Sequence, residues 1–575
     1  MGTIKNFKSK KLVVLIVMIC MLLTTTVLIL SDNKGVTEGG KITINNLSDR
    51  QRDTLFKVCK VWGFVKYYHP EVATGKYDWD QELLEIIPKV MYLKRDYKVD
   101  KVLYTWINDL GNVKLSDKKS EEENIIKLKP NTEWIRDDKF INKELSDLLV
   151  KIEGAERTGS NYYVSFDEYL GYPNFDNEKS YEDMDYTDDG YRLLSLFRYW
   201  NIIEYYSPYR ELMDEDWNLV LKEFIPLMIE GNDKISHDLT LSQVIARLQD
   251  EHGAVLISWD LSMHFGKYVA PLQLRYIEDK LVVVDNFKEQ NLNIEVEIGD
   301  IILKVDGRDV EELKNDWEKH YPASSYTYPR NELDNLITKS NNEYISLTIE
   351  RGEKIFETKV KGITHIYEMI KKRTPKKSHE IINGDIGYIF PGSIQENEIS
   401  SIMDKFQDMK AIIIDLRCYP NEYIVYSVGN RIVPTPTEFV EITTPDPYTP
   451  GQFKVGEVFT IGEEDNKDVY KGKIVLLIDE QSMSQPEYTA MAFKVAPEAI
   501  LIGSPTRGAD GNISGIPLVG KAYTYISGLG IYYPDGSQTQ RIGIIPDIEV
   551  KPTIEGIKEG IDEVLERAIE YINEK

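Results

Sequence analysis

Cysteine is nearly absent from this sequence, which has three cysteines, Cys20, Cys59 and Cys418, among 575 residues. No two of them have the C-x-x-C spacing of a metal or redox motif, so a disulfide-rich scaffold and a cysteine-bound zinc site are excluded. We expect Cys59 and Cys418 to be free thiols packed in the interior. Glycine (37) and proline (24) are too scarce for a collagenous or wholly disordered chain.

Positive charge is also in short supply, because 69 Lys and Arg residues face 95 Asp and Glu residues, for a net charge of −26. An acidic surface repels phosphate backbones, so the sequence predicts no nucleic-acid partner. With 42% hydrophobic and 29% charged residues, the chain has the composition of a globular protein. Its length predicts about four domains. The oligomeric state stays open.

The sequence lacks the spaced ligand sets of metal and phosphate sites. Its carboxylates are numerous but dispersed, and no H-x-x-x-H pair occurs. The GADGN segment at residues 508–512 has no Lys-Ser/Thr pair of the kind that phosphate loops need. We therefore predict neither a metal nor a cofactor.

One apolar run, Leu12 to Leu30, contains 19 uncharged residues and would span about 28 Å as a helix, close to the thickness of a bilayer. More aliphatic residues follow its three threonines, which favours an uncleaved anchor over a cleavable signal. Basic residues precede the run and acidic sequence follows it, so the chain after Ser31 should lie outside the cytoplasm. We predict a cytoplasmic tip and membrane anchor at residues 1–34 and a single-pass protein of the cell membrane.

Two segments resemble each other at a constant offset of 138 residues. The matched pairs are Trp62 and Trp200, Tyr68 and Tyr206, Pro70 and Pro208, Trp79 and Trp217, Pro88 and Pro226, and Leu110 and Leu248. Apolar residues at helical spacing predict all-α helical repeats at 45–113 and 186–260, with aromatic cores. The charged segment between them, 114–185, is predicted to be a solvated linker.

Only the second repeat ends in a D-x-H motif, formed by Asp250 and His252; the first has Lys114 at the position of His252. A histidine that one copy has and the other lacks is a candidate functional residue. The alternative is that His252 only shapes a turn between a helix and a strand.

Short alternating strands follow at 265–362. The string from Ile298 to Gly307 is a strand entered through Gly-Asp and left through an Asp-Gly turn. This pattern resembles the PDZ domains of secreted proteases, which bind an extended peptide at a sheet edge. A structural spacer is the alternative for this small β-rich unit.

Strands and helices alternate in the last part of the chain, residues 383–575, which predicts an α/β layer. The aliphatic runs IGYIF, AIIIDL and IVLLI are the expected strands, and helices are expected near 399–406 and 486–495. Ser484 lies between the strand IVLLI and the second helix, where free N–H groups and the helix dipole stabilise an oxyanion. The same Ser484-x-x-Glu487 pattern is also an ordinary helix-capping box.

The motifs DIGYIF, AIIIDLR, SMSQPE, AILIGSPTRGADGN and IGIIPDIEV occur in this order between residues 385 and 550. They resemble the catalytic domain of the tail-specific, or C-terminal-processing, serine peptidase family S41, especially the branch with tricorn core protease and the retinoid-binding protein repeats. The resemblance covers roughly 240–575. It implies a crotonase/ClpP-like α/β fold and a serine peptidase acting on a peptide or protein.

The resemblance assigns the nucleophile to Ser484 and half of the oxyanion hole to the main-chain N–H of Gln485. The second donor usually comes from a DLRxNxGG turn, which here reads DLRCYPNE without the paired glycines. A main-chain amide between Tyr419 and Glu422, with Tyr419 first, is the candidate.

The family's catalytic lysine, 25 residues after the nucleophile, is replaced by Ala509, and no histidine occurs within 384–575. Tricorn-like members take a histidine from the preceding module, which makes His252 the candidate base, with Lys494 and Lys521 in reserve. The candidate groups that would orient His252 are Gln540, Asp250 and Glu487, and Asp510 is a further alternative.

The sequence thus predicts a membrane-anchored extracytoplasmic serine endopeptidase with helical repeats, a PDZ-like unit and an α/β catalytic domain. The alternative is a catalytically inactive envelope protein of the same fold that binds a peptide or an apolar ligand, because the lysine and the paired glycines are missing. Neither the natural substrate nor the cleavage site follows from the sequence.

Overall fold

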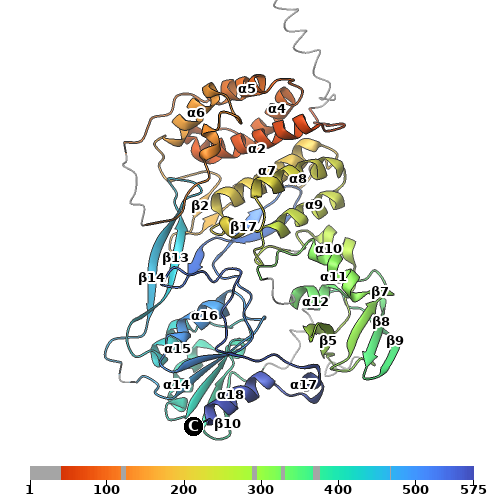
Figure 1. Cartoon of the computed structure of the whole chain (residues 1–575), viewed down its shortest axis with the longest axis vertical. Helices are drawn as coiled ribbons and strands as arrows, with labels where there is room; N and C mark the ends of the chain where they lie inside the picture. The colour runs from red at the N-terminus through yellow and green to blue at the C-terminus, as the bar shows by residue number, and fades with distance from the viewer. Residues whose placement is uncertain are drawn as a thin grey trace, which may run out of the picture.

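The computed structural model describes residues 40–117, 125–254, 256–287, 294–325, 331–366, 376–466 and 468–574. The expected membrane anchor at 1–34 lies outside these ranges. Within them, no helix has both the length and the apolar character to cross a bilayer. Figure 1 shows a helical unit at the top, a small β-rich unit in green at the right, and an α/β domain at the bottom.

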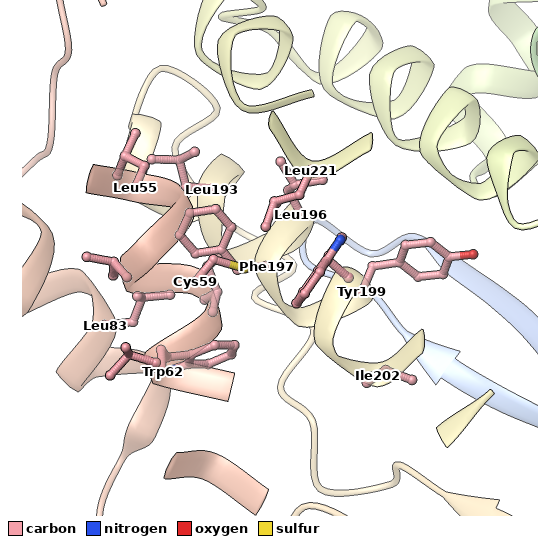
Figure 2. Packing of buried hydrophobic residues seen from close by; sticks show 14 of the residues in the cluster. Leu55, Cys59, Trp62, Leu83, Leu193, Leu196, Phe197, Tyr199, Ile202 and Leu221 are labelled. Atoms are coloured by element: carbon pink, nitrogen blue, oxygen red, sulfur yellow. The ribbon is translucent and has the colours of Figure 1, made fainter. Parts of the chain in front are cut away.

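The helical unit is built on two long central helices. Its main helices are α2 (Asp49–Tyr68), α4 (Trp79–Val90), α5 (Asp96–Asn108), α7 (Asp189–Tyr206), α8 (Trp217–Glu230) and α9 (Lys234–Arg247), with short α3 (Pro70–Ala73) and α10 (Trp259–Phe265). Helices α2 and α7 end directly before the expected breakers, since Pro70 and Pro208 follow their last residues by two positions. Figure 2 shows Leu55, Cys59 and Trp62 of α2 packed with residues of α7 in one buried core.

The two tryptophan pairs that the sequence aligned make the same contacts. The indole N–H of Trp62 donates to the carbonyl of Trp79 at 2.8 Å, and Trp79 returns the bond at 2.9 Å. Trp200 and Trp217 exchange the same bonds at 2.7 and 3.0 Å. The aromatic residues therefore serve the core, as expected, while the interpretation of the two segments as copies of one repeat stays a prediction.

Part of the expected solvated linker is core. Helix α6 (Lys143–Glu153) buries Leu145, Leu149 and Ile152 against the helical unit. These residues stand at helical spacing (i, i+4, i+7), so they form one apolar stripe despite the charged residues around them. Helix α6, within the expected linker at 114–185, is therefore a part of the helical unit and not a solvated connection.

The middle unit is a five-strand path with an additional short strand and two helices. Its elements are β4 (Gln273–Ile277), β5 (Lys280–Asp285), β6 (Ile301–Val305), β7 (Arg308–Asp309), α11 (Val310–Glu318), α12 (Asn331–Leu336), β8 (Tyr344–Arg351) and β9 (Lys354–Lys361). The order of the path is β4-β5-β6-β8-β9, and β7 pairs with β6. Strand β6 lies between the Gly-Asp and Asp-Gly turns, as the sequence indicated. Gly299 and Gly307, the glycines of these turns, have φ of +86° and +80°.

The last domain is an α/β sandwich, which agrees with the expected fold class. Its six-stranded sheet has the order β10 (His379–Ile382), β11 (Ile386–Ile389), β12 (Ala411–Asp415), β15 (Lys473–Ile478), β16 (Ala499–Gly503) and β20 (Ile548–Glu549). All neighbouring strands from β11 to β20 are parallel, and only β10 is antiparallel.

Alternate strand residues face two helical layers. Ile412, Ile414, Ile474 and Leu476 pack with α14 (Glu396–Phe406), α15 (Val425–Ile432) and α16 (Gln485–Lys494). Ala411, Ile413, Val475 and Leu477 pack on the other side with α18 (Glu563–Asn573). Both faces of the sheet are therefore covered, as its uninterrupted aliphatic strands require.

A hairpin of the α/β domain, β17 (Ile513–Pro517) and β18 (Tyr523–Ser527), reaches into the helical unit. Its inner side chains belong to the core of that unit, namely Ile516, Leu518, Val519, Ala522 and Ile526. The hairpin therefore fixes the helical unit, with its D-x-H motif, against the α/β domain.

A second hairpin, β13 (Thr437–Pro445) and β14 (Phe453–Ile461), also extends to the helical unit (Figure 1). At its tip, the N–H of Gly451 donates to the carbonyl of Tyr205 at 3.0 Å, and Arg210 donates to the Gly451 carbonyl at 2.8 Å. Short β1 (Ile126–Leu128) and β19 (Gly530–Tyr532) complete this four-stranded sheet.

Candidate active site

Ser484 stands at the junction between strand β15 and helix α16, as the sequence predicted. It is the residue directly before the helix, and its backbone adopts φ +64° and ψ −116°. Such a conformation is costly for a residue with a side chain, and it persists only where the surroundings enforce it. Strained residues of this kind gather at functional sites.

The loops after three adjacent parallel strands meet around Ser484. The DLRCYPNE loop follows β12, the nucleophile loop follows β15, and the segment with Ala509 follows β16. Ligands of parallel α/β sheets bind outside the carboxyl ends of the strands. The sheet therefore gathers these three motifs at the edge where a substrate binds.

Glu487 holds the nucleophile loop and the Ala509 segment together. One carboxylate oxygen accepts from the N–H of Ser484 at 2.9 Å and of Ala509 at 3.2 Å. The other accepts from the N–H of Gly508 at 2.8 Å and from the hydroxyl of Thr506 at 2.5 Å. Burial raises the pKa of Glu487, and these four bonds oppose that rise by favouring the ionised carboxylate. Glu487 is thus an anchor of the loop and not a partner of His252.

The DLRCYPNE loop runs alongside Ser484 between two fixed points. The hydroxyl of Ser482 donates to the carbonyl of Leu416 at 2.8 Å, and the side-chain amide of Gln485 donates to the carbonyl of Glu422 at 3.2 Å. The two anchors lie on either side of Ser484 in the sequence. Residues 417–421 are therefore held next to the nucleophile.

From Tyr419 to Glu422, this loop leaves two main-chain donors for an oxyanion. Pro420 has no N–H, and the N–H of Asn421 donates to the carbonyl of Pro391 at 3.0 Å. The N–H groups of Tyr419 and Glu422 remain as candidates for the second donor. On the other side, the N–H of Gln485 is at the first position of α16, where the helix offers it no acceptor.

His252 is buried, with 6% of its side chain exposed. Its Nδ1 lies 3.2 Å from a carboxylate oxygen of Asp250 and 3.0 Å from the hydroxyl of Ser527. Its Nε2 is buried and has no hydrogen-bond partner. The structure therefore leaves free the nitrogen that a general base would use, and it does not join His252 to Ser484 by a hydrogen bond.

Asp250 is the group that orients His252. Burial alone would raise the pKa of Asp250, but hydrogen bonds from His252 and from the N–H of Ser527, at 2.6 Å, hold it below its ordinary value. An ionised Asp250 favours the tautomer that donates from Nδ1 and keeps the lone pair on Nε2. Of the candidate orienters, the structure brings Asp250 to the ring.

Ser527 is the partner of His252 that sequence reasoning missed. It ends strand β18, in the hairpin that enters the helical unit, and it is fully buried. No local pattern marks a serine at the end of a short strand as a histidine partner. Only the long-range docking of the hairpin on the D-x-H loop reveals the contact.

The other candidate orienters do not contact the ring. Gln540 is buried, and its side-chain oxygen has no hydrogen-bond partner. Asp510 accepts from the N–H of Gly511 at 2.8 Å. Burial and the charge of Glu487 raise the pKa of Asp510 well above its ordinary value.

Neither reserve lysine is placed as a base. Lys494 lies in the last turn of α16, about 15 Å along the helix from Ser484, and pairs with Asp547. The side chain of Lys521 is 72% exposed and pairs with Glu182 at 3.3 Å. Among the described residues, no group of three or more His, Cys, Asp and Glu side chains is arranged to hold a metal ion.

Comparison with known proteins identifies this domain. Residues 385–550 match the model of peptidase family S41. Mature CPAF complexed with lactacystin is similar over 67% of this chain and 99% of its own, at 14% identity and a TM-score of 0.50. A mutant of CPAF gives 14% identity, 67% and 98% coverage and a TM-score of 0.51.

The photosystem II D1 C-terminal processing protease is similar over 64% of this chain and 96% of its own, at 12% identity and a TM-score of 0.38. No curated protein matches the sequence. At these identities the two CPAF structures show the fold alone, and the match to the family model over the loops around Ser484 adds the family. The domain at residues 385–550 therefore belongs to peptidase family S41, a family of serine-type peptidases.

Proposed function

We propose that this peptidase is a membrane-anchored, extracytoplasmic endopeptidase in which Ser484 is the nucleophile and His252 the general base. One observation carries the assignment of the base. Within the described residues, His252 is a buried imidazole with an orienting carboxylate on Nδ1 and no partner on Nε2. His237 shares these features, but His252 stands next to Glu251, which pairs with Arg507 in the segment after β16, at the edge of the sheet that presents Ser484.

In this mechanism, Nε2 of His252 removes the proton of Ser484 Oγ as the oxygen attacks the scissile carbonyl. The N–H of Gln485 and an N–H of the loop at Tyr419 stabilise the oxyanion. The imidazolium then gives its proton to the leaving amine, and water hydrolyses the acyl-enzyme by the same route. Asp250 stabilises the imidazolium by charge, a role that an uncharged Gln540 would not fill.

The middle unit is proposed to bind an extended peptide at its β4 edge. The N–H of Leu274 donates to the side chain of Asn335, and that of Tyr276 donates to Asp334, each at 3.2 Å. Side chains of α12, rather than another strand, therefore occupy the donors of this edge. A bound peptide strand would compete with these side chains for the N–H groups of β4, so Asn335→Ala is expected to tighten peptide binding. An unchanged affinity would favour the alternative that this unit is a structural spacer.

The proposed anchor rests on the apolar run at residues 12–30, which lies outside the described residues. The full chain is expected to pellet with membranes and to be cut by protease added outside the cell. Recovery of a soluble mature form that begins near Ser31 would contradict this part of the proposal.

The catalytic proposal is tested by peptide hydrolysis with purified variants. Ser484→Ala is expected to abolish hydrolysis, and His252→Ala to lower kcat by about 10²–10⁴-fold. The double variant is expected to be hardly worse than Ser484→Ala, because the two residues act as a unit. His237→Ala is the matched control, since its Nδ1 lies 2.8 Å from Asp238 and its buried Nε2 also lacks a partner.

His237→Ala is expected to keep the kcat of the folded enzyme. Full activity of His252→Ala would refute the assigned base. If the wild-type chain binds peptide but hydrolyses none, the inactive binding protein is the correct description. Ala509 in place of the family lysine and the unpartnered oxygen of Gln540 favour that second candidate.

A further inference from the structure

Glu251, between the two residues of the D-x-H motif, joins three parts of the chain. Its carboxylate pairs with the guanidinium of Arg507 in the α/β domain and accepts from the hydroxyl of Tyr321, in the middle unit, at 2.5 Å. Its own N–H donates to the hydroxyl of Ser324 at 2.8 Å. The side chains of Glu251 and Arg507 are only 6% and 7% exposed, so the ion pair is shielded from water.

Arg507 is in turn built into the nucleophile loop. Its main-chain N–H donates to the carbonyl of Ser482 at 3.2 Å, and its Nε donates to the carbonyl of Glu480. The next two residues along the chain donate their N–H groups to Glu487, the anchor of Ser484. One residue thus contacts the main chain two positions before the nucleophile and the carboxylate one position before the candidate base.

Two buried, opposite charges from distant parts of the chain fix the register of the surfaces that carry them. Without Arg507, the carboxylate of Glu251 would be buried and uncompensated, so the surfaces are held in the arrangement that pairs the two charges. Ser527 holds the imidazole from the β18 side, whereas Arg507 holds the adjacent residue from the side of the nucleophile loop. The second contact therefore sets where His252 stands relative to Ser484.

We propose that the Arg507–Glu251 ion pair is the positioning device that brings His252 to Ser484. Arg507 is a positioning residue, because it touches the loops that carry the reacting groups and not the groups themselves. The inference rests on the proposed function, since it matters only if Ser484 and His252 act together. It adds a residue, and a reason for the arginine in SPTRGADG, that the family resemblance did not assign.

The test compares Arg507→Gln with Arg192→Gln in the full-length protein. Arg192 is the matched control because its side chain is 1% exposed and pairs with Asp189 inside the helical unit. Arg507→Gln is expected to lower kcat about 100-fold, the effect of displacing a reacting group by about 1 Å, with KM nearly unchanged. Arg192→Gln is expected to keep the wild-type kcat. Peptide hydrolysis measures the rate, and circular dichroism gives the folded fraction to which each rate is normalised.

Two further variants keep the test decisive. Arg507→Lys is expected to have a higher kcat than Arg507→Gln. The double variant Glu251→Arg/Arg507→Glu, which exchanges the two charges, is expected to have a higher kcat than either Glu251→Arg or Arg507→Glu alone. If Arg507→Gln does not fold, Glu251→Gln decides, because its amide keeps the shape and can still accept from Tyr321. A folded Arg507→Gln or Glu251→Gln with wild-type kcat would overturn the inference.

A wild-type protein without hydrolysis, or a His252→Ala variant with full activity, would instead overturn the proposed function. The two failures are therefore distinguishable. A loss of kcat in Arg192→Gln as large as that in Arg507→Gln would also contradict the inference, because it would show that any buried arginine pair has the same effect.

Discussion

Replacement of Glu487 by glutamine tests how the strained backbone of Ser484 is held. Each carboxylate oxygen accepts two bonds, one pair from Ser484 and Ala509 and the other from Gly508 and Thr506. Glutamine keeps one of the oxygens and puts an NH₂ group in place of the other. If the NH₂ group turns toward Ser484 and Ala509, it faces two N–H donors in a fully buried site. If it turns toward Gly508 and Thr506, it faces one N–H donor, because the Thr506 hydroxyl can accept.

The amide should take the orientation that leaves only the N–H of Gly508 without an acceptor, and such a buried donor costs about 1–3 kcal/mol, so the free energy of unfolding should fall by about that amount. Activity should fall further than stability, because the amide opposes the N–H of Gly508 and loosens the loop that enforces the φ +64° conformation of Ser484. Urea unfolding followed by circular dichroism measures the first effect. Peptide hydrolysis per folded molecule measures the second.

Glu398→Gln is the matched control, because Glu398 is also the third residue of a helix and accepts from the N–H of Gln395 at 3.1 Å, but at an exposed site. We expect it to change the free energy of unfolding by less than about 0.5 kcal/mol. Equal effects of Glu487→Gln and Glu398→Gln would refute the reasoning. So would a Glu487→Gln variant with wild-type stability and activity.

Three further predictions concern the other units. Gly63→Ala should destabilise the helical unit by about 1–3 kcal/mol in urea unfolding, because a Cβ there would stand 1.7 Å from Asn201 Oδ1; an unchanged midpoint would contradict the packing of α2 on α7. Arg198→Met should cost about 3–5 kcal/mol, because it leaves Lys66 alone to pair with buried Asp80 and Glu178, and a loss below about 1 kcal/mol would show that water reaches the site. Burial raises the pKa of Asp334 to about 8, so the folded protein keeps a proton that the unfolded chain loses near pH 4. The free energy of unfolding should therefore fall as the pH rises from about 4 to 8. Asp334→Asn should flatten this dependence in thermal melts across that range.

The position of Ser484 between a strand and a helix followed from the sequence because its signals are local. An aliphatic run followed by Ser484-x-x-Glu487 marks the end of a strand and the start of a helix, and the structure has β15 and α16 there. The strands β11 and β12 were equally clear, since parallel strands covered on both faces are continuous apolar runs. Cys59 and Cys418 are free, as their spacing indicated.

The surroundings of His252 did not follow from the sequence because they depend on contacts between distant segments. Asp250, Gln540 and Glu487 were equivalent candidates until the structure showed which of them reaches the ring. Ser527 and Arg507 come from loops whose composition is ordinary, and they reach the D-x-H loop only because the α/β domain docks on the helical unit.

Helix α6 shows the opposite limit, in which a real local signal was hidden. Its buried residues Leu145, Leu149 and Ile152 have helical spacing, but charged residues surround them. Average composition therefore favoured a solvated linker, whereas the spacing of three residues determined the structure.

The central claim, that His252 activates Ser484, is tested most directly by the rate at which a fluorophosphonate labels Ser484, with the modified residue identified by mass spectrometry. We expect the wild-type enzyme to be labelled at Ser484, His237→Ala to react at the same rate, and His252→Ala to react about 10²-fold or more slowly. Labelling of His252→Ala at the wild-type rate, or no labelling of Ser484 in the folded wild-type enzyme, would contradict the account.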